Sequence, residues 1–309
     1  MPHVEIIHRT QYAYARPVML TAHRLMLRPQ DSHDLRLHDA RLLVEPPAAT
    51  MRWAHDVFGN SVCILEWEPG LRTASLSITS RLELTHFPSG NGTPRATLDP
   101  SAESYPFSYA ASEVADLSRL AERHLADPEG RVDVWARRFA GPGATGTLAM
   151  LEAMNAAIHT EFTYLAREEE GTQSPCETLR LGSGACRDLA LLMMEAVRSL
   201  GLAARFVTGY VYDDSTRETR GGGATHAWCA VYLPGAGWVE YDPTNGLVAG
   251  DHLVRIAVTR TPEQAVPIGG GFIGEVLDFA GLTVDVRVTA GHEPVPDPQP
   301  PLTRPVSAG

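Results

Sequence analysis

Basic residues and long apolar segments are scarce in this sequence, and both shortages restrict what the protein can be. Its 309 residues include 26 Lys plus Arg against 37 Asp plus Glu, which gives a net charge of −11. No basic stripe forms, so we expect no nucleic-acid partner. No apolar run approaches the length of a membrane span, and the opening residues MPHVEIIHRT lack the pattern of a signal peptide. We therefore expect a cytoplasmic protein that does not bind membranes.

Cysteine is scarce as well, with Cys63, Cys176, Cys186 and Cys229 as the whole set. Four thiols in so long a chain without a secretory signal do not predict a disulfide framework. His226 and Cys229 have the H-x-x-C spacing of some metal sites, but in a strand side chains three residues apart point to opposite faces. No second closely spaced pair completes such a site. We expect neither a metal ion nor another cofactor.

The hydrophobic pattern divides the chain into four parts. Residues 1–95 alternate like strands bounded by Pro, Gly and Asn, which predicts a β-rich N-terminal domain that folds separately. Residues 96–145 read as a linker and a helical segment, and 146–290 as the catalytic core with a C-terminal strand. The Pro-rich tail, 291–309, is expected to be disordered. Helices followed by antiparallel strands predict an α+β core.

A single thiol stands where a Gly-rich loop becomes a helix. Cys186 follows LGSGA and begins an apolar helical pattern that continues to Leu200. A helix N-terminus stabilises a thiolate, and Gly182 and Gly184 leave room beside the sulfur. Asp188 opposes this by its charge, and its ordinary role is to complement the helix dipole. The pattern therefore indicates a nucleophile at Cys186 and leaves Asp188 outside the catalytic set.

A nucleophilic cysteine also needs a base that a third group orients. His226 begins the strand HAWCAVYL after a Gly-rich loop, 217–225, that could cover a cleft. The next strand, GWVEYD, ends at Asp242 because Pro243 follows. The turn LPGAG joins the two strands into a hairpin, so His226 and Asp242 fall together at its open end. This hairpin can lie beside the helix of Cys186.

These segments resemble the transglutaminase-like core of the papain-type cysteine enzymes. The resemblance rests on GACRD at 184–188, GLAAR at 201–205, Gly209-Tyr210, His226-Ala227-Trp228, Gly237-Trp238 and Asp242-Pro243-Thr244. The front of the chain, with YAY at 12–14, Pro17-Val18, LMLRP at 25–29 and DVFGN at 56–60, resembles the β-rich N-terminal domain that accompanies this core in bacterial proteins. A papain-like transglutaminase core behind a β-rich domain is the fold that the resemblance implies.

The resemblance implies a role for each matching residue. The nucleophile is Cys186, the general base and acid is His226, and the orienting carboxylate is Asp242. Tyr164 is the candidate for a second oxyanion donor beside the backbone N–H of Cys186, the alternative being a partly buried ring. Relatives often carry Glu where this chain has Ala230. The resemblance implies that this difference affects substrate contacts or the local pairing of residues, and not the triad. Trp228 and Trp238 shape the cleft or pack beneath it, and Cys176 is read as structural.

The function that follows is acyl transfer from the amide of a peptide or protein substrate through a thioester. Water as the acceptor would make the protein a peptidase or amidase, which we favour, and an amine would make it a transglutaminase. The alternative is a peptide- or protein-binding module that retains this fold without catalysis. The intact set of Cys186, His226 and Asp242 argues against that alternative. The sequence identifies neither substrate nor acceptor, nor the oligomeric state or the role of the N-terminal domain.

Overall fold

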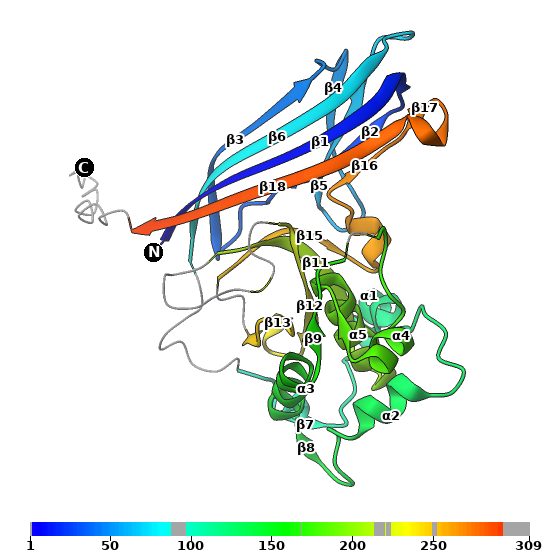
Figure 1. Ribbon diagram of the computed structural model, residues 1–309. Coiled ribbons are helices and arrows are strands. Elements are labelled where there is room, and N and C mark those ends of the chain that lie inside the picture. Colours follow the sequence, from blue (N-terminus) through cyan, green and yellow to red (C-terminus); the bar gives the residue numbers. More distant parts are fainter. Residues whose placement is uncertain are drawn as a thin grey trace, which may run out of the picture.

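The computed structural model of the protein has two parts stacked on one another: a β-sandwich, and below it a sheet covered by helices (Figure 1). It describes residues 2–87, 97–167, 169–212, 220, 224–248 and 252–292. The predicted linker around 90 and the Pro-rich tail beyond 292 lie outside these residues. No helix among the described residues is long and apolar enough to cross a membrane. The mixed fold confirms the predicted α+β class.

The sandwich is built mostly from the strands that the N-terminal alternation predicted. These strands are β1 (Pro2–Leu20), β2 (His23–Arg28), β3 (Leu35–Glu45), β4 (Thr50–His55), β5 (Ser61–Glu66) and β6 (Thr73–His86). One sheet has the order β17-β1-β6-β3, with β18 also paired to β1, and the other has the order β16-β2-β5-β4. Alternate side chains of both sheets meet in one apolar core, which includes Leu25, Cys63, Leu65, Leu76 and Ile78.

The sandwich is completed by the end of the chain, which corrects the predicted domain boundaries. The late strands are β16 (Ile268–Gly269), β17 (Phe272–Ile273) and β18 (Phe279–His292). Strand β18 is antiparallel to β1 over almost its whole length, from Tyr14 opposite Phe279 to Pro2 opposite His292. Its assignment to the catalytic core was therefore wrong, and residues 1–95 do not make the sandwich alone. Alternation identifies a strand but carries no information on which edge it will join.

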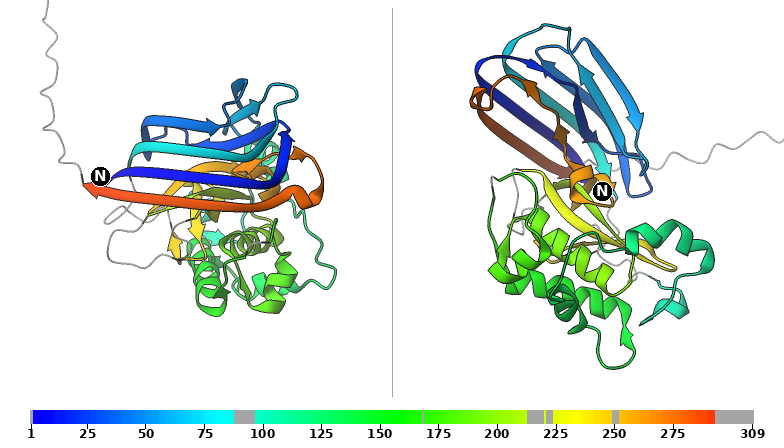
Figure 2. Two further views of the ribbon diagram at one scale, coloured as in Figure 1. Left: turned by 45° about the horizontal axis from the view of Figure 1, so that its top comes forward. Right: turned by 90° about the vertical axis from the view of Figure 1, so that its right-hand side faces the viewer.

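The lower part has five helices among the described residues, on one side of a five-stranded sheet (Figure 2). The helices are α1 (Ala111–Ala121), α2 (Arg131–Arg137), α3 (Thr147–Glu161), α4 (Pro175–Leu181) and α5 (Cys186–Ser199). The sheet has the order β14-β13-β12-β11-β15. Its strands are β11 (Ala204–Val211), β12 (His226–Leu233), β13 (Gly237–Asp242), β14 (Leu247–Val248) and β15 (Leu253–Thr259).

Shorter elements connect these. They are η1 (Pro100–Ala102), β7 (Ser104–Tyr105), β8 (Thr145–Gly146), β9 (Thr163–Tyr164), β10 (Ser183–Gly184), η2 (Pro262–Ala265) and η3 (Val276–Asp278). The sequence analysis missed α2 and α4. Each has only seven residues, so each offers two turns of apolar periodicity, too few to distinguish from a loop.

Helix α5 is the centre of the lower part. Nearly all of its residues are buried, and its apolar side packs on the face of β12 that carries Ala227, Cys229 and Val231. Its polar residues are also buried and paired: Arg198 Nη1 donates to Glu195 Oε1 at 2.9 Å, with both side chains fully covered. A helix buried all round holds its first residue in a fixed place, and that residue is Cys186.

The two parts share a second apolar cluster, so the sandwich is not an independent appendage. Val4, Ile6, Leu82 and Leu84 of the sandwich pack against Tyr210, Val254 and other residues of the core sheet. Two buried histidines of the sandwich form hydrogen bonds across this interface. His8 Nδ1 lies 2.8 Å from the Tyr210 hydroxyl, and His86 Nδ1 lies 2.7 Å from that of Tyr212.

These two histidines predict an acid-sensitive interface. Burial lowers the pKa of His8 and of His86 from 6.5 to about 4. Between pH 6.5 and 4 the unfolded chain therefore binds protons that the folded chain does not, so the free energy of unfolding falls as the pH falls. We expect the melting temperature to drop through this window, and to drop less in the double variant His8→Gln, His86→Gln.

The control is His33→Gln, because His33 is exposed on the same sandwich. It should follow the wild-type pH profile of the melting temperature. A double variant that keeps the full wild-type slope between pH 6.5 and 4 would show that the acid sensitivity arises elsewhere.

Candidate active site

The first turn of α5 is held in place by Asp188. Its Oδ2 accepts a hydrogen bond from Ala185 N at 2.9 Å, closing a capping box at the start of the helix. Both carboxylate oxygens also accept from Arg167 Nη1 at 2.9 Å, and Oδ1 accepts from Gln173 N at 2.7 Å. The charge of this fully buried carboxylate is thus matched by a guanidinium. Asp188 thus caps the helix through hydrogen bonds, where the sequence analysis had given it only the role of complementing the helix dipole.

Gly184 is required by this cap. A Cβ at position 184 would lie 2.8 Å from the Cβ of Asp188, closer than side-chain carbons approach one another. The same residue pairs with Tyr164, because β10 runs parallel to β9 with Gly184 opposite Tyr164. Leu165 N donates to the Gly184 carbonyl at 2.9 Å. The loop before Cys186 is therefore clamped between Asp188 on one side and β9 on the other.

His226 and Asp242 meet at the open end of the β12–β13 hairpin. Cys229 lies opposite Tyr241 in the ladder, so His226 at the start of β12 and Asp242 at the end of β13 extend past the last paired residues. His226 Nε2 lies 2.8 Å from Asp242 Oδ2, and both side chains are fully buried. The contact predicted from the hairpin is present in the structure.

The Asp242 carboxylate is fixed by two residues that follow it in the chain. Oδ1 accepts from Thr244 N at 2.9 Å, and Oδ2 accepts from Asn245 Nδ2 at 2.8 Å. The sequence analysis did not identify Asn245. Its Nδ2 also lies 3.4 Å from His226 Nε2, and its Oδ1 accepts from Arg220 N at 2.8 Å. The one signal in the sequence is its place in the D-P-T-N turn, where Asn side chains commonly bond nearby backbone.

The charges of the pair stabilise one another. Burial by itself would lower the pKa of His226, but the Asp242 carboxylate and the Cys186 side chain raise it to about 10. Burial would raise the pKa of Asp242, but the His226 charge and the hydrogen bonds from His226, Asn245 and Thr244 lower it. At neutral pH the pair is therefore an imidazolium and a carboxylate, each buried and stabilised by the charge of the other.

Cys186 completes the group. It begins α5, is only 8% exposed, and lies near enough to His226 to contribute to the raised imidazole pKa. Because Nε2 of His226 faces Asp242, Nδ1 is the nitrogen left for the thiol, and a hydrogen bond and the charge of Cys186 both contribute to the raised imidazole pKa. The backbone N–H of Cys186 is in the first turn of α5, where N–H groups have no partner within the helix. The imidazole of His226 thus lies between the thiol of Cys186 and the carboxylate of Asp242 and interacts with both.

Tyr164 lies beside this group. Its ring is half-buried and packs against the cluster that contains Cys186. Burial, and then the nearby Cys186 side chain, raise the pKa of its hydroxyl. A neutral hydroxyl next to the thiol can donate a hydrogen bond, which is the chemistry an oxyanion donor needs.

Trp228 packs beneath the imidazole and does not line an open cleft. It is fully buried, and its ring is stacked on that of His226 with 5.9 Å between centroids. Gly209, which is opposite His226 in the β11–β12 ladder, makes room for it: a Cβ there would lie 2.8 Å from the Trp228 ring and 2.0 Å from the Val254 carbonyl oxygen. Trp238, in contrast, is partly exposed and lies under the Arg205 guanidinium.

Ala230 lies between Arg205 of β11 and Glu240 of β13 in the sheet. Glu240 accepts from Arg255 Nη1 at 2.7 Å. A glutamate at position 230 would therefore add to this charged row and not to the contacts of Cys186, His226 and Asp242.

Most of the Gly-rich loop 217–225, which could cover a cleft, lies outside the described residues.

The remaining cysteines occupy unreactive surroundings. Burial raises the pKa of Cys63 to about 11 and that of Cys229 to about 12. Burial, and then the hydrogen bond from Cys176 to Asp127, raise the pKa of Cys176. Cys229 faces α5, whereas His226 faces Asp242, so the two do not share a site. No cluster of three or more metal-binding side chains occurs in the part of the chain that the structure describes.

These environments predict which thiol alkylates first. Cys63, Cys176 and Cys229 are protonated at neutral pH, whereas Cys186 begins a helix beside a charged imidazole. Brief treatment with iodoacetamide near pH 7, followed by peptide mapping, should label Cys186 preferentially. The same labelling should be slower in His226→Ala, because the base beside the thiol is gone. Faster labelling of any other cysteine would contradict this assignment.

Both parts of the chain are similar to known protein families. Residues 4–85 match the family model of the bacterial transglutaminase-like N-terminal region, and residues 134–243 match that of the transglutaminase-like superfamily. An uncharacterized protein of Mycobacterium tuberculosis is 26% identical over 275 residues, which are 86% of each chain. A shorter match, 32% identical over 71 residues, is to an uncharacterized protein of Bacillus subtilis and covers 20% of this chain and 10% of that protein.

One solved structure is similar over nearly the whole chain. It is a Cytophaga hutchinsonii protein provisionally described as a cysteine protease, with a TM-score of 0.67 and 18% identity, covering 94% of this chain and 90% of that one. At this identity the likeness shows the fold, including the sandwich together with the core.

Proposed function

We propose that this chain, which belongs to the transglutaminase-like superfamily and carries the bacterial N-terminal region of that family, is a cysteine-dependent acyl-transfer enzyme. Its substrates are amides of peptides or proteins, and it acts through a thioester. The observation that supports this most directly is the buried contact of His226 with Asp242 beside a cysteine at a helix start. No structural purpose requires a buried ion pair next to a thiol.

The geometry supports a role for each of the three residues. The thiolate of Cys186 attacks the carbonyl carbon of the amide, and Nδ1 of His226 holds the proton that the thiol has released. Asp242 bonds Nε2 and so keeps the ring turned with Nδ1 toward the sulfur. The negative charge on the carbonyl oxygen faces the N–H of Cys186 and, we propose, the hydroxyl of Tyr164.

Collapse of this intermediate breaks the carbon–nitrogen bond. His226 gives its proton to the leaving amine, and a thioester remains on Cys186. Water, deprotonated by His226, then attacks the thioester and restores the thiol. An amine in place of water would give a new amide, so the same three residues serve both outcomes, and hydrolysis is the outcome we favour.

The absence of lysine from the sequence restricts which amine could accept the acyl group. All 26 residues counted as Lys plus Arg are arginines, so the chain offers no lysine amine. An amine acceptor would have to come from another molecule. We propose a cytoplasmic enzyme that acts on peptide or protein substrates, with no role for nucleic acid or membranes.

Trapping of the acyl-enzyme tests the proposal. The protein is mixed with a panel of peptide amides, quenched in acid within seconds, and analysed by mass spectrometry. We expect an adduct on Cys186 whose mass equals the substrate minus its leaving amine, and which hydroxylamine removes. If no substrate in a broad panel acylates the protein while iodoacetamide still labels Cys186, the enzyme proposal is rejected. The hypothesis of a peptide- or protein-binding module without catalysis then takes its place.

A further inference from the structure

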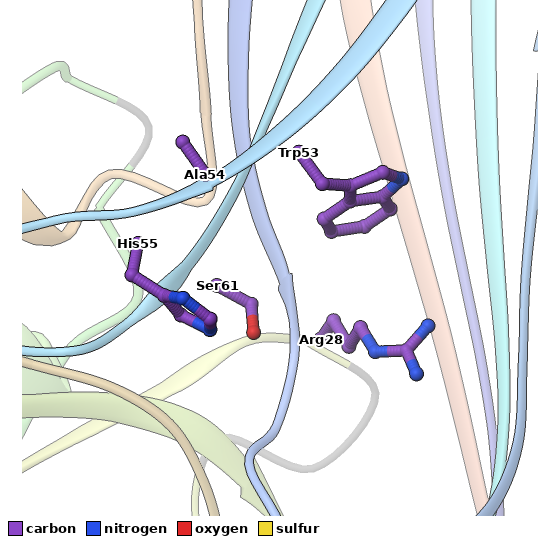
Figure 3. A pocket seen from close by; sticks show the side chains of 5 residues that line it. All are labelled: Arg28, Trp53, Ala54, His55 and Ser61. Carbon is purple, nitrogen blue, oxygen red and sulfur yellow. The ribbon is translucent and has the colours of Figure 1, made fainter.

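A pocket lined partly by polar side chains lies in the sandwich, a part of the molecule distinct from the one that contains Cys186. A pocket of about 240 Å³ is lined by Arg28, Trp53, Ala54, His55 and Ser61, which come from β2, β4 and β5 (Figure 3). Trp53 lies opposite Cys63, and His55 opposite Ser61, in the β4–β5 ladder. Since opposite residues share a face, the pocket lies on the inner face of this sheet, at its open edge.

The polar groups of the pocket are available to a ligand. Arg28 lies over the Trp53 ring at 5.8 Å, and its side chain has no ion pair or hydrogen bond with any residue that the structure describes. The same holds, within the described chain, for the side chains of His55 and Ser61. Arg24, also on β2, differs from Arg28 in being paired with Asp56 at 3.5 Å. The Arg28 guanidinium beside Trp53, on the far side of the pocket from His55 and Ser61, offers its hydrogen-bond donors to an acceptor (Figure 3).

The charge and shape of the pocket select the class of acceptor. Arg28 supplies one positive charge in a protein whose net charge is −11, so a singly charged anion is matched and a doubly charged one is not. A guanidinium fork fits a carboxylate through two parallel hydrogen bonds. The Trp53 ring, 44% exposed, adds an apolar wall beside it. A carboxylate attached to an apolar or aromatic group satisfies both features.

The pocket is connected to the catalytic group by one turn. Strands β4 and β5 are joined by residues 56–60, and Phe58 of this turn packs on the cluster that contains Trp228. Asn60 holds the turn on β15, because its Nδ2 donates to the Val258 carbonyl at 2.7 Å and its Oδ1 accepts from Val258 N at 2.9 Å. Trp228 in turn stacks on His226. The flank of the sandwich that bears the pocket is thus fixed against the part of the core that bears the imidazole.

The edge of the sheet is also open beside the pocket. Among the strands that the structure describes, β4 pairs with β5 alone, so within this part of the chain its other edge has backbone groups available to an extended segment. From these observations we propose that the pocket binds a carboxylate of an extended peptide substrate, remote from the amide that Cys186 attacks. The link of this pocket to catalysis rests on the proposed function. The binding of a carboxylate to the pocket does not depend on it.

Binding is tested in full-length Cys186→Ala protein, which cannot consume a substrate. The tryptophans are labelled with ¹⁵N, and the Trp53 indole signal is assigned by its loss in Trp53→Phe. The probes are three N-acetylated hexapeptides: Thr-Val-Gln-Thr-Val-Phe as the C-terminal amide, the same peptide with a free C-terminal carboxylate, and the amide with Glu in place of Gln. The second and third probes distinguish a terminal from a side-chain carboxylate.

We expect at least one carboxylate probe to shift the Trp53 signal and to bind about tenfold more tightly than the neutral amide, as a charged hydrogen bond implies. Arg28→Gln should remove this preference. Arg52→Gln is the matched control, because Arg52 is the neighbour of Trp53 on β4 and points to the other face. It should leave the preference unchanged.

Three results would overturn the assignment. Equal affinity for charged and neutral probes would exclude a carboxylate site, and so would unchanged affinity in Arg28→Gln. Tighter binding of inorganic phosphate than of either carboxylate probe would assign the pocket to a different ligand.

The link to catalysis is tested separately in protein with Cys186 intact. Matched acidic and neutral amide substrates should differ in kcat/KM, and Arg28→Gln should reduce the ratio of the two values toward one. A ratio near one in the wild type would refute the link to substrate, even where the probes bind. Failure of every substrate to acylate Cys186, with probe binding intact, would refute the proposed function and leave the carboxylate site standing.

Discussion

Replacement of Cys186 by alanine is expected to abolish formation of the acyl-enzyme and all turnover of amide substrates. In the proposed mechanism the acyl group is transferred to the sulfur, and neither His226 nor Asp242 can take its place, because both side chains are fully buried and bonded to one another. The substitution removes one atom from a residue whose backbone is held by the Asp188 cap. We therefore expect the melting temperature to change little while turnover falls to background.

The matched control for this experiment is Cys176→Ala. Cys176 is a partly exposed thiol on the neighbouring helix α4, and it bonds Asp127 and not the catalytic group. Its turnover should equal that of the wild type. Residual thioester formation in Cys186→Ala, or loss of turnover in Cys176→Ala with the fold intact, would refute the assigned nucleophile.

Replacement of Asp242 by asparagine should lower turnover by a factor of about 10³–10⁴, the loss seen when an orienting carboxylate is removed. The raised pKa of His226, about 10, depends on the Asp242 charge. In the variant the imidazole loses the charge that keeps it protonated, so its pKa should fall. Rates are compared by single-turnover acylation between pH 5 and 10, with the melting temperature as a check on folding.

Glu240→Gln is the control for this change. Glu240 is a second carboxylate on β13, two residues before Asp242, and it pairs with Arg255. Its removal should leave the acylation rate and its pH profile close to those of the wild type. An Asp242→Asn variant that acylates at the wild-type rate would show that another group orients His226.

Much of the catalytic group could be predicted because its determinants are local. Cys186 follows a run of small residues and precedes an apolar period, and both features are visible in a short window. Pro243 ends a strand at Asp242, and LPGAG brings that strand back along the one that starts at His226. These features set the positions of the residues along helix and strand, and the hairpin then brings two of them together.

Other residues of the site could not be predicted because their contacts join distant elements. Asn245 bonds Asp242 only when the turn after β13 has folded. Arg167 reaches Asp188 across the loop that precedes α4. Neither residue type is distinctive, since Asn and Arg are ordinary on any surface. Their roles depend on coordinates that propensity and periodicity do not contain.

The sequence by itself determined most of the longer strand and helix segments of this protein, the helix start at Cys186 and the hairpin that carries His226 and Asp242, because backbone preference and hydrophobic period act over a few residues. Tertiary structure alone decided that β18 joins β1, that the sandwich shares a core with the sheet that carries His226, and that Arg28, Trp53, His55 and Ser61 line one pocket. Any strand with the right alternation could pair with an exposed edge. Which one does so depends on the packing of the whole chain, where many weak contacts between distant residues add up.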